Sequence, residues 1–177
     1  MSEDTENIYR SIGVEPIINC RGTFTIIGGS IERPEVLAAM ERAAGNFVQY
    51  DELAAGVGQR LAELTGAEWG MISSGCAAGM KHVTAACVTG GDPEKLIRIP
   101  DLTGLEKTQV IVPAYSRNAY DHALRNIGIE FVTVETPEQM QAAIGPRTAM
   151  VYLVTGHHSD PGQPLSLEVL AEIARPH

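Results

Sequence analysis

The chain has 177 residues, 44% of them hydrophobic, which is enough to bury the core of one ordinary domain. Its 13 basic and 22 acidic residues give a net charge of −9, which disfavours a nucleic-acid surface because such surfaces cluster Lys and Arg. Cys20, Cys76 and Cys87 form no C-x-x-C pair, so the sequence suggests neither a disulfide framework nor a zinc knuckle, but free thiols in a reducing compartment. The N-terminus is acidic and polar, and no apolar run approaches roughly 18 residues, so we expect a soluble cytoplasmic protein.

The first half of the chain is predicted to be mainly helical. A helix over 34–44 begins with a Pro in its first turn and ends before a Gly. A second helix over 51–65 has Asp51 as its N-cap. A short strand over 68–73 then leads into a helix over 76–88. The apolar face of the second helix consists of Leu53, Val57, Leu61 and Leu64.

The second half of the chain alternates strands and helices. Thr136 and Gln139 form a capping box around Pro137, and Ser166 caps the last helix. Alternation from residue 68 onward requires right-handed crossovers and a mainly parallel sheet, so the expected fold class is α/β, a three-layer sandwich. The strands are predicted over 108–114, 129–134 and 148–155, and the helices over 118–128, 136–145 and 166–175.

Residues 73–76, Ser-Ser-Gly-Cys, stand where a predicted strand passes into a helix. Ligands of open α/β sheets collect at this place, where helix N-termini expose unpaired N–H groups. Gly75 lets the backbone approach an anion closely, and Ser74 adds a hydroxyl donor, so a phosphate fits. The sequence lacks both G-x-G-x-x-G and G-x-x-x-x-G-K-[ST], which disfavours a nucleotide. On these residues alone, an N-cap with a tight turn and no ligand stays open.

Four longer stretches carry a family resemblance. They are "VEPIINCRGTFTIIGG" (14–29), "LAELTGAEWGMISSGCAAGM" (61–80), "VIVPAYSRNAYDHALRNIG" (110–128) and "LVTGHHSDPGQPLSLEVLAEIAR" (153–175). In order and spacing they resemble fold-type I pyridoxal-phosphate enzymes of the aminotransferase class V-like group. From about Ile8 onward, the chain resembles the bacterial L-seryl-tRNA(Sec) selenium transferases and their D-glucosaminate-6-phosphate ammonia lyase relatives. The resemblance implies an N-terminal arm with the substrate-entrance segment over 1–33 and part of the cofactor-binding large domain over 34–177.

The resemblance also implies roles for individual residues. The family's phosphate loop falls on Ser74, Gly75 and Cys76, which are expected to hold the phosphate of pyridoxal 5'-phosphate. Tyr115 falls where related enzymes stack a ring on the pyridine, and His157 falls near a polar side chain that faces the cofactor. The segment that lines the substrate entrance in relatives contains Asn19, Arg21 and Thr25.

Simpler roles remain alternatives for several of these residues. Tyr115 could be a half-buried aromatic at a strand end, and Arg21 and its neighbours could have plain surface or capping roles. His158 and Asp160 could suggest a metal site, but no third spaced ligand accompanies them, so we expect no metal.

Two groups that this chemistry requires are expected beyond His177. Family order puts the aspartate that pairs with the pyridine nitrogen, and the lysine that forms the Schiff base, after the last helix. The lysines present do not fall at the family's position, so the sequence predicts a truncated chain that is inactive by itself. These lysines are Lys81, Lys95 and Lys107.

The resemblance implies a lyase or transferase for an amino acid or amino-sugar derivative. It would remove the α-proton and then eliminate or replace a β-substituent. One alternative is the tRNA-dependent selenium transferase itself. The net charge weakens it, and so does the position of the "EPIIN" motif, which starts at Glu15 with no tRNA-binding domain expected before it. The other alternative is a non-catalytic remnant that binds a phosphorylated ligand. A homodimer or larger ring with a small-molecule substrate is the family expectation for the longer chain.

Overall fold

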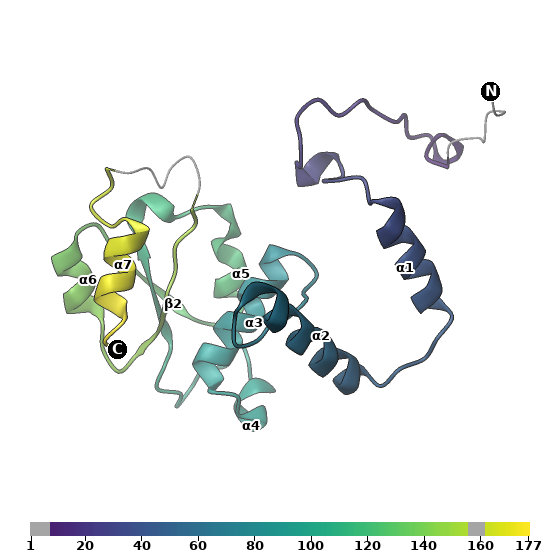
Figure 1. Cartoon of the computed structure of the whole chain (residues 1–177). Coiled ribbons are helices and arrows are strands. Elements are labelled where there is room, and N and C mark those ends of the chain that lie inside the picture. Colours follow the sequence, from purple (N-terminus) through teal and green to yellow (C-terminus); the bar gives the residue numbers. More distant parts are fainter. Residues whose placement is uncertain (1–7, 156–161) are drawn as a thin grey trace. The chain divides into compact units, whose positions relative to one another are not determined.

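The computed structural model describes residues 8–155 and 162–177 (Figure 1). The chain divides into two compact units, Met1–Leu53 and Ala54–His177. In the first unit, α1 spans Pro34–Ala44, as predicted from its proline start and glycine stop. No described residue of the first unit is buried, and its large apolar side chains are open to solvent. The most exposed of these are Ile18, Ile31 and Phe47.

Helix α2 spans Tyr50–Thr65, and it begins one residue earlier than predicted. Asp51 therefore lies inside the first turn and is not the N-cap, which corrects the prediction. The reason is that the Leu53 N–H donates to the Gln49 carbonyl at 3.0 Å. This is the first hydrogen bond of helical spacing, so the helix begins directly after Gln49. The predicted apolar face is not a buried face in the described structure, since Gly58 is the buried residue of α2.

The segment 68–73 is not a strand, contrary to the prediction. It lies against α2, where a Cβ added to Gly58 would fall 2.3 Å from the Trp69 ring. The Gly70 N–H also donates to the Gly58 carbonyl at 3.2 Å. A strand exists only where another strand completes its hydrogen-bond ladder, and no described strand lies beside these residues.

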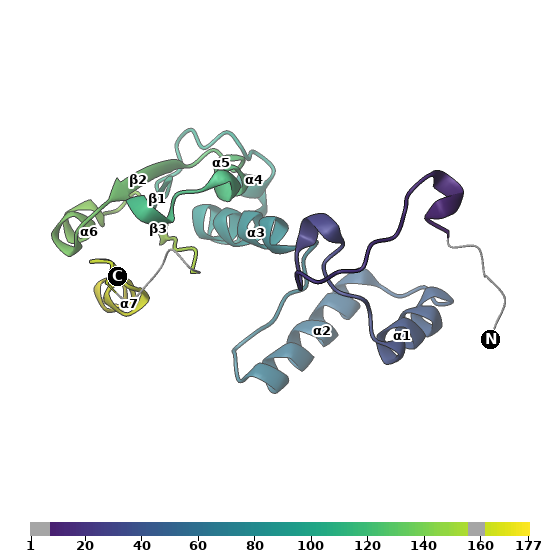
Figure 2. The same cartoon turned by 90° about the horizontal axis from the view of Figure 1, so that it is seen from above.

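The second unit is built on a parallel three-stranded sheet in the order β2-β1-β3, which confirms the α/β fold class (Figure 2). Its strands are β1 (Gln109–Pro113), β2 (Glu130–Val134) and β3 (Thr148–Val151). They lie where predicted, although β3 ends before the predicted 155. The carboxyl ends of all three strands meet at one edge because the strands are parallel.

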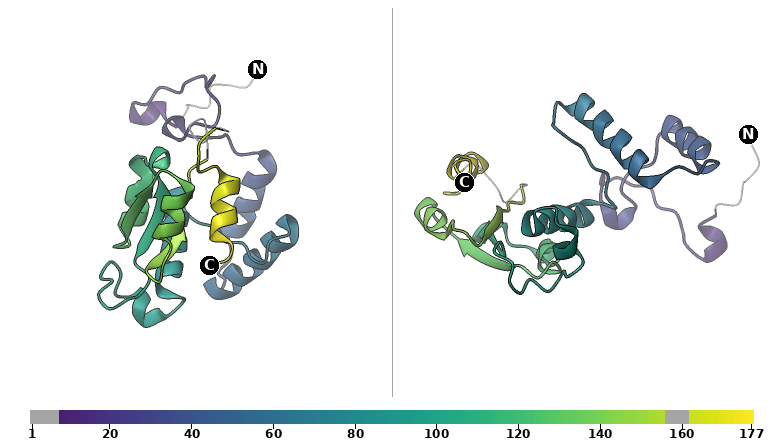
Figure 3. Two further views of the ribbon diagram at one scale, coloured as in Figure 1. Left: turned by 90° about the vertical axis from the view of Figure 1, so that its left-hand side faces the viewer. Right: turned by 90° about the horizontal axis from the view of Figure 1, so that it is seen from below.

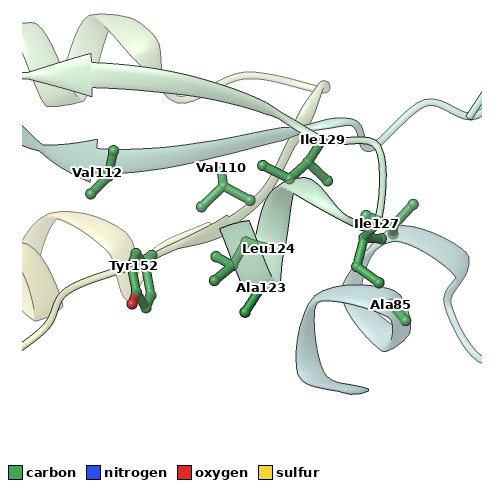
Figure 4. Close-up of a cluster of buried hydrophobic side chains, with 9 residues drawn as sticks. Ala85, Val110, Val112, Ala123, Leu124, Ile127, Ile129 and Tyr152 are labelled. Carbon is green, nitrogen blue, oxygen red and sulfur yellow. The ribbon is translucent and has the colours of Figure 1, made fainter. Parts of the chain in front are cut away.

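Helices cover both faces of this sheet, as the alternation predicted. Along β1 the side chains alternate, so that Val110 and Val112 pack in one cluster and Ile111 in the other. The first core cluster joins the sheet to α3 (Cys76–Thr89) and α5 (His122–Arg125) (Figure 4). It consists of Ala85, Val88, Val110, Val112, Ala123, Leu124, Ile127, Ile129 and Tyr152.

The second core cluster lies on the opposite face, where α6 (Pro137–Ala143) and α7 (Leu167–Ala174) run next to each other (Figure 3). It consists of Ile111, Val134, Met140, Leu165 and Leu170.

Local capping signals were largely correct. The Thr136 hydroxyl accepts from the Gln139 N–H at 3.3 Å, and the Ser166 hydroxyl accepts from the Val169 N–H at 3.4 Å. The Gln139 side chain, however, accepts from the N–H of Glu135, one residue before the predicted partner.

Two helical segments differ from prediction. The predicted helix over 118–128 is a 3-10 helix, η4 (Ala119–Asp121), followed directly by α5, and a short helix that was not predicted, α4, spans Pro93–Leu96. In residues 8–155 and 162–177, no helix has the length and apolar character of a membrane span.

Candidate functional site

The turn before α3 exposes backbone donors. Gly75 is the N-cap, and no side chain caps this end of the helix. The first N–H group with a helical partner is that of Gly79, which donates to the Gly75 carbonyl at 3.1 Å. The N–H groups of Cys76, Ala77 and Ala78 have no carbonyl within the helix to pair with. This end of a 14-residue helix therefore offers several donors and a partial positive charge.

The conformation of residues 73–75 explains why a glycine stands in this turn. Gly75 has φ 86° and ψ 172°, an extended conformation of positive φ that is essentially restricted to glycine. Its N–H donates to the Ser73 carbonyl at 2.8 Å, and the Ser73 hydroxyl donates back to the Gly75 carbonyl at 3.0 Å. Ser74 and Cys76 are exposed, and within the described part of the chain no group pairs with the Ser74 hydroxyl. Ser73 thus stabilises the turn, while Ser74 is available to a ligand.

Tyr115 follows β1 directly, in the 3-10 helix η3 (Ala114–Ser116). Its ring packs against the second core cluster, and its hydroxyl donates to the Leu165 carbonyl at 2.5 Å. Burial raises the pKa of the Tyr115 phenol above its ordinary value of 10.0. The helix that begins at Cys76 packs in the first cluster, so the structure places these two predicted site residues on elements that cover different faces of the sheet.

Tyr152 is a polar group near α3 that was missed in the sequence analysis. It follows β3, is 8% exposed, and donates its hydroxyl to the Met80 sulfur at 3.2 Å in the second turn of α3. Burial is the main cause that raises the pKa of the Tyr152 phenol; Asp121 and Cys76 raise it electrostatically, and a hydrogen bond with Asn118 lowers it. The available signal was a tyrosine inside the apolar run "AMVYLVT".

The loop after β1 supplies three further polar side chains that sequence reasoning missed. Ser116 and Asp121 are buried, and Asn118 lies between them. The Ser116 hydroxyl accepts from the N–H of Val154 at 2.8 Å, which ties this loop to the chain leaving β3. Contacts between segments this far apart in sequence have no local signature, so periodicity could not reveal them.

The predicted substrate-entrance residues lie in the first unit and are exposed. The Asn19 side chain closes a turn, because its Oδ1 accepts from the N–H groups of Arg21 and Gly22 at 2.8 and 3.1 Å. The Arg21 guanidinium lies 4.9 Å from the centre of the Phe24 ring. Thr25 begins a 3-10 helix, η2 (Thr25–Ile27).

Other predicted residues can be placed briefly. His157, His158 and Asp160 lie outside the described residues. In the described part of the chain, His, Cys, Asp and Glu side chains form no group of three that could hold a metal. The lysines lie in α3 (Lys81), in α4 (Lys95) and before β1 (Lys107).

Comparisons with known proteins identify relatives of this chain. No family model matches the sequence. The chain is 32% identical over 179 residues to D-glucosaminate-6-phosphate ammonia lyase of Salmonella typhimurium, covering 97% of this chain and 48% of that protein. It is 29% identical over 180 residues to 5'-C-glycyluridine monooxygenase-decarboxylase of a Streptomyces species, covering 96% of this chain and 45% of that protein.

The fold agrees with the sequence comparison. A solved structure of D-glucosaminate-6-phosphate ammonia lyase matches with a TM-score of 0.89 and 32% identity, over 97% of this chain and 49% of that one. The chain spans about half the length of the curated relatives that it matches. Over nearly all its residues, the chain is therefore a relative of D-glucosaminate-6-phosphate ammonia lyase in both sequence and fold.

Proposed function

We propose that the protein to which these residues belong is a pyridoxal-phosphate-dependent lyase or transferase. Its substrate would be an amino acid or amino-sugar derivative that loses an α-proton and then loses or exchanges a β-substituent. The observation that carries the proposal is the uncapped N-terminus of α3 behind Gly75, in a chain related to an ammonia lyase. In this proposal Ser74, Gly75 and Cys76 bind the cofactor phosphate.

The chemistry of this turn fits a phosphate. Free N–H groups at the start of α3 donate to anionic oxygens, and the helix dipole favours a dianion there. The exposed Ser74 hydroxyl adds a donor without competing for the turn, since the Ser73 hydroxyl already stabilises it. A Cβ on Gly75 would touch nothing, so the space above the turn is open to a ligand.

The remaining residues would orient the ligand. Pyridoxal phosphate, when bound, supplies an electron sink for negative charge at the substrate α-carbon. The family resemblance assigns to Tyr115 the ring that stacks on the pyridine, and in this structure that ring packs against the second core cluster with its hydroxyl on the Leu165 carbonyl. Tyr152, whose hydroxyl donates to the Met80 sulfur, would hold the second turn of α3 in place below the phosphate turn.

The Schiff-base lysine and the acid at the pyridine nitrogen belong, in this proposal, to protein outside residues 1–177. Lys81, Lys95 and Lys107 would not substitute for that lysine, so residues 1–177 alone would bind the cofactor without turning over substrate. We further propose a cytoplasmic homodimer or larger ring. The selenium transferase alternative is not preferred, because the net charge of −9 does not suit a tRNA ligand.

Binding of pyridoxal 5'-phosphate to the full-length protein tests the proposal, measured by fluorescence titration. Replacing Gly75 by Ala at φ 86° should strain the turn by about 1 kcal/mol or more and weaken binding at least fivefold. Ser74→Ala removes one donor and should weaken binding severalfold, by about 1 kcal/mol.

The matched control is Gly145→Ala, since a Cβ at Gly145 meets nothing and Gly145 is not among the glycines of positive φ. This variant should bind like the wild type. Absence of binding by the wild type, or equal binding by Gly75→Ala and Gly145→Ala, would overturn the assignment of the phosphate site.

A further inference from the structure

The loop that joins β1 to α5 is held at the carboxyl edge of the sheet by side-chain hydrogen bonds. Asn118 donates from Nδ2 to the Ser116 carbonyl at 3.0 Å, and its Oδ1 accepts from the Tyr120 N–H at 2.8 Å. Ser116 in turn bonds the N–H of Val154, just beyond β3. The loop that carries Tyr115 is therefore tied to the exit of β3 on one side.

On its other side the loop is tied to β2 through Arg117. The Arg117 guanidinium lies 4.5 Å from the centre of the Phe131 ring, a cation–π arrangement. Its Nη1 donates to the Thr133 hydroxyl at 3.1 Å, and its Nε donates to Oδ2 of Asp121. Arg117 thus bridges β2 and the end of its own loop, and its planar group is fixed by three different contacts.

Asp121 is the buried partner of this bridge. Its side chain is 2% exposed, whereas that of Arg117 is 36% exposed. One carboxylate oxygen bonds Arg117, and among the described residues the other, Oδ1, has no hydrogen-bond partner. A buried carboxylate with an unpaired oxygen is costly, and an apolar side chain of similar size would often give equal or greater stability. Fold stability alone therefore does not account for an aspartate here.

We propose that Asp121 is a positioning residue for the candidate site. By holding Arg117 against Phe131 and Thr133, it fixes the backbone of residues 114–118, which presents Tyr115, Ser116 and Asn118 at the carboxyl edge of the sheet. The inference rests on the proposed function for its effect on cofactor binding. The contacts that define the bridge stand independently of that function.

The experiment compares Asp121→Asn and Arg117→Lys with the wild-type full-length protein. Asparagine keeps the shape but removes the charge, and lysine keeps the charge but loses the planar contacts. Both variants should show faster amide hydrogen exchange over residues 114–118, with exchange in β1, β2 and β3 unchanged. Both should also weaken the binding of pyridoxal 5'-phosphate by about tenfold or more, because small displacements of positioning groups have effects of this size.

Two further variants make the test decisive. Glu130→Gln removes the carboxylate of an exposed ion pair, 3.2 Å long, between the first residue of β2 and Arg147 just before β3, and should change neither measurement. Thr133→Val removes the hydrogen bond from Arg117 to the Thr133 hydroxyl and replaces Asp121→Asn in the test if that variant does not fold. It should raise the amide exchange rate over residues 114–118 by a smaller factor than Asp121→Asn would.

The possible outcomes separate the two proposals. Wild-type exchange over 114–118 in Asp121→Asn, or in Thr133→Val where the former does not fold, would overturn the positioning role. A general rise of exchange across all three strands would overturn it too, because it would show a role in stability only. If the wild type binds no pyridoxal 5'-phosphate, the proposed function fails, while the exchange data still decide whether Asp121 positions the loop.

Discussion

The Tyr152 phenol lies at the end of an apolar strand, with its hydroxyl on the Met80 sulfur and Asp121 near enough to act on it electrostatically. Both burial and the charge of Asp121 favour the neutral phenol, so the pKa of Tyr152 is raised above 10.0 in the folded protein. At the residue scale, the structure thus favours the protonated phenol, which donates to the Met80 sulfur beside α3.

This raised pKa predicts a loss of stability in alkali. The unfolded chain ionises Tyr152 near pH 10, whereas the folded chain does so only at higher pH. Between those values the folded state binds more protons, so this contribution is fully present below pH 10 and is lost as the pH rises through the folded pKa.

Urea unfolding at pH 8 and at pH 10.5 checks this expectation. Tyr152→Phe should lose less stability between the two pH values than the wild type does. The control is Tyr120→Phe, because Tyr120 is 66% exposed; this variant should lose as much stability as the wild type. An equal pH dependence for wild type and Tyr152→Phe would contradict it.

At the element scale, the turns that lead into the strands differ in how much they tolerate a side chain. Gly128, before β2, has φ 97°, and a Cβ there would fall 2.2 Å from the backbone oxygen of Pro100. Gly145, before β3, has open space around the same position. The structure therefore requires a glycine at position 128, whereas it leaves room for a side chain at position 145.

Gly128→Ala should lower the free energy of unfolding by about 2 kcal/mol or more, since it combines a left-handed φ with a clash against backbone. Gly145→Ala should stay within about 0.5 kcal/mol of the wild type. Denaturant unfolding of both variants measures the difference, and similar midpoints would show that the chain near Pro100 can move aside.

Leucines two residues apart, around the start of α7, provide a second comparison at this scale. Leu165 is 0% exposed and belongs to the second core cluster, whereas Leu167 is 55% exposed. Leu165→Ala should cost about 2–5 kcal/mol through lost contacts and a cavity, and Leu167→Ala well under 1 kcal/mol. Thermal unfolding would reveal a smaller gap if α7 can collapse onto α6.

At the scale of the whole molecule, the two units differ in what holds them together. The second unit, Ala54–His177, which we call the sheet unit, has two core clusters. The described residues of the first unit contain no buried side chain. Large apolar side chains such as Ile31, at 98% exposure, gain nothing from burial within their own unit. The stability of residues 1–177 is therefore expected to reside in the sheet unit.

Removing residues 1–45 tests this expectation. The shortened chain should unfold within about 2 °C of the 177-residue chain, because the deletion removes no described buried side chain. Scanning calorimetry on both chains gives the comparison. A large drop in the unfolding temperature would mean that the N-terminal residues stabilise the sheet unit after all.

Much of the fold was predictable from the sequence because its signals are local. Pro34 and Gly45 mark α1, Thr136 and Ser166 cap their helices, and apolar runs mark three parallel strands. Each of these depends on residues within one turn or one strand, so the chain carries the information without its tertiary contacts. The same holds for the donors at the start of α3, which follow from a glycine before a helix.

Other features were decided only in three dimensions. The apolar segment 68–73 has the composition of a strand, but pairing requires a neighbour, and its Trp69 packs on Gly58 instead. Asp121 reads as one more charged residue near a helix start, yet tertiary packing buries it and pairs it with Arg117. The sequence by itself thus determined most of the order of elements and the glycine turn that leaves donors free before α3, whereas burial and long-range hydrogen bonds, which depend on distant residues, determined the polar edge of the sheet.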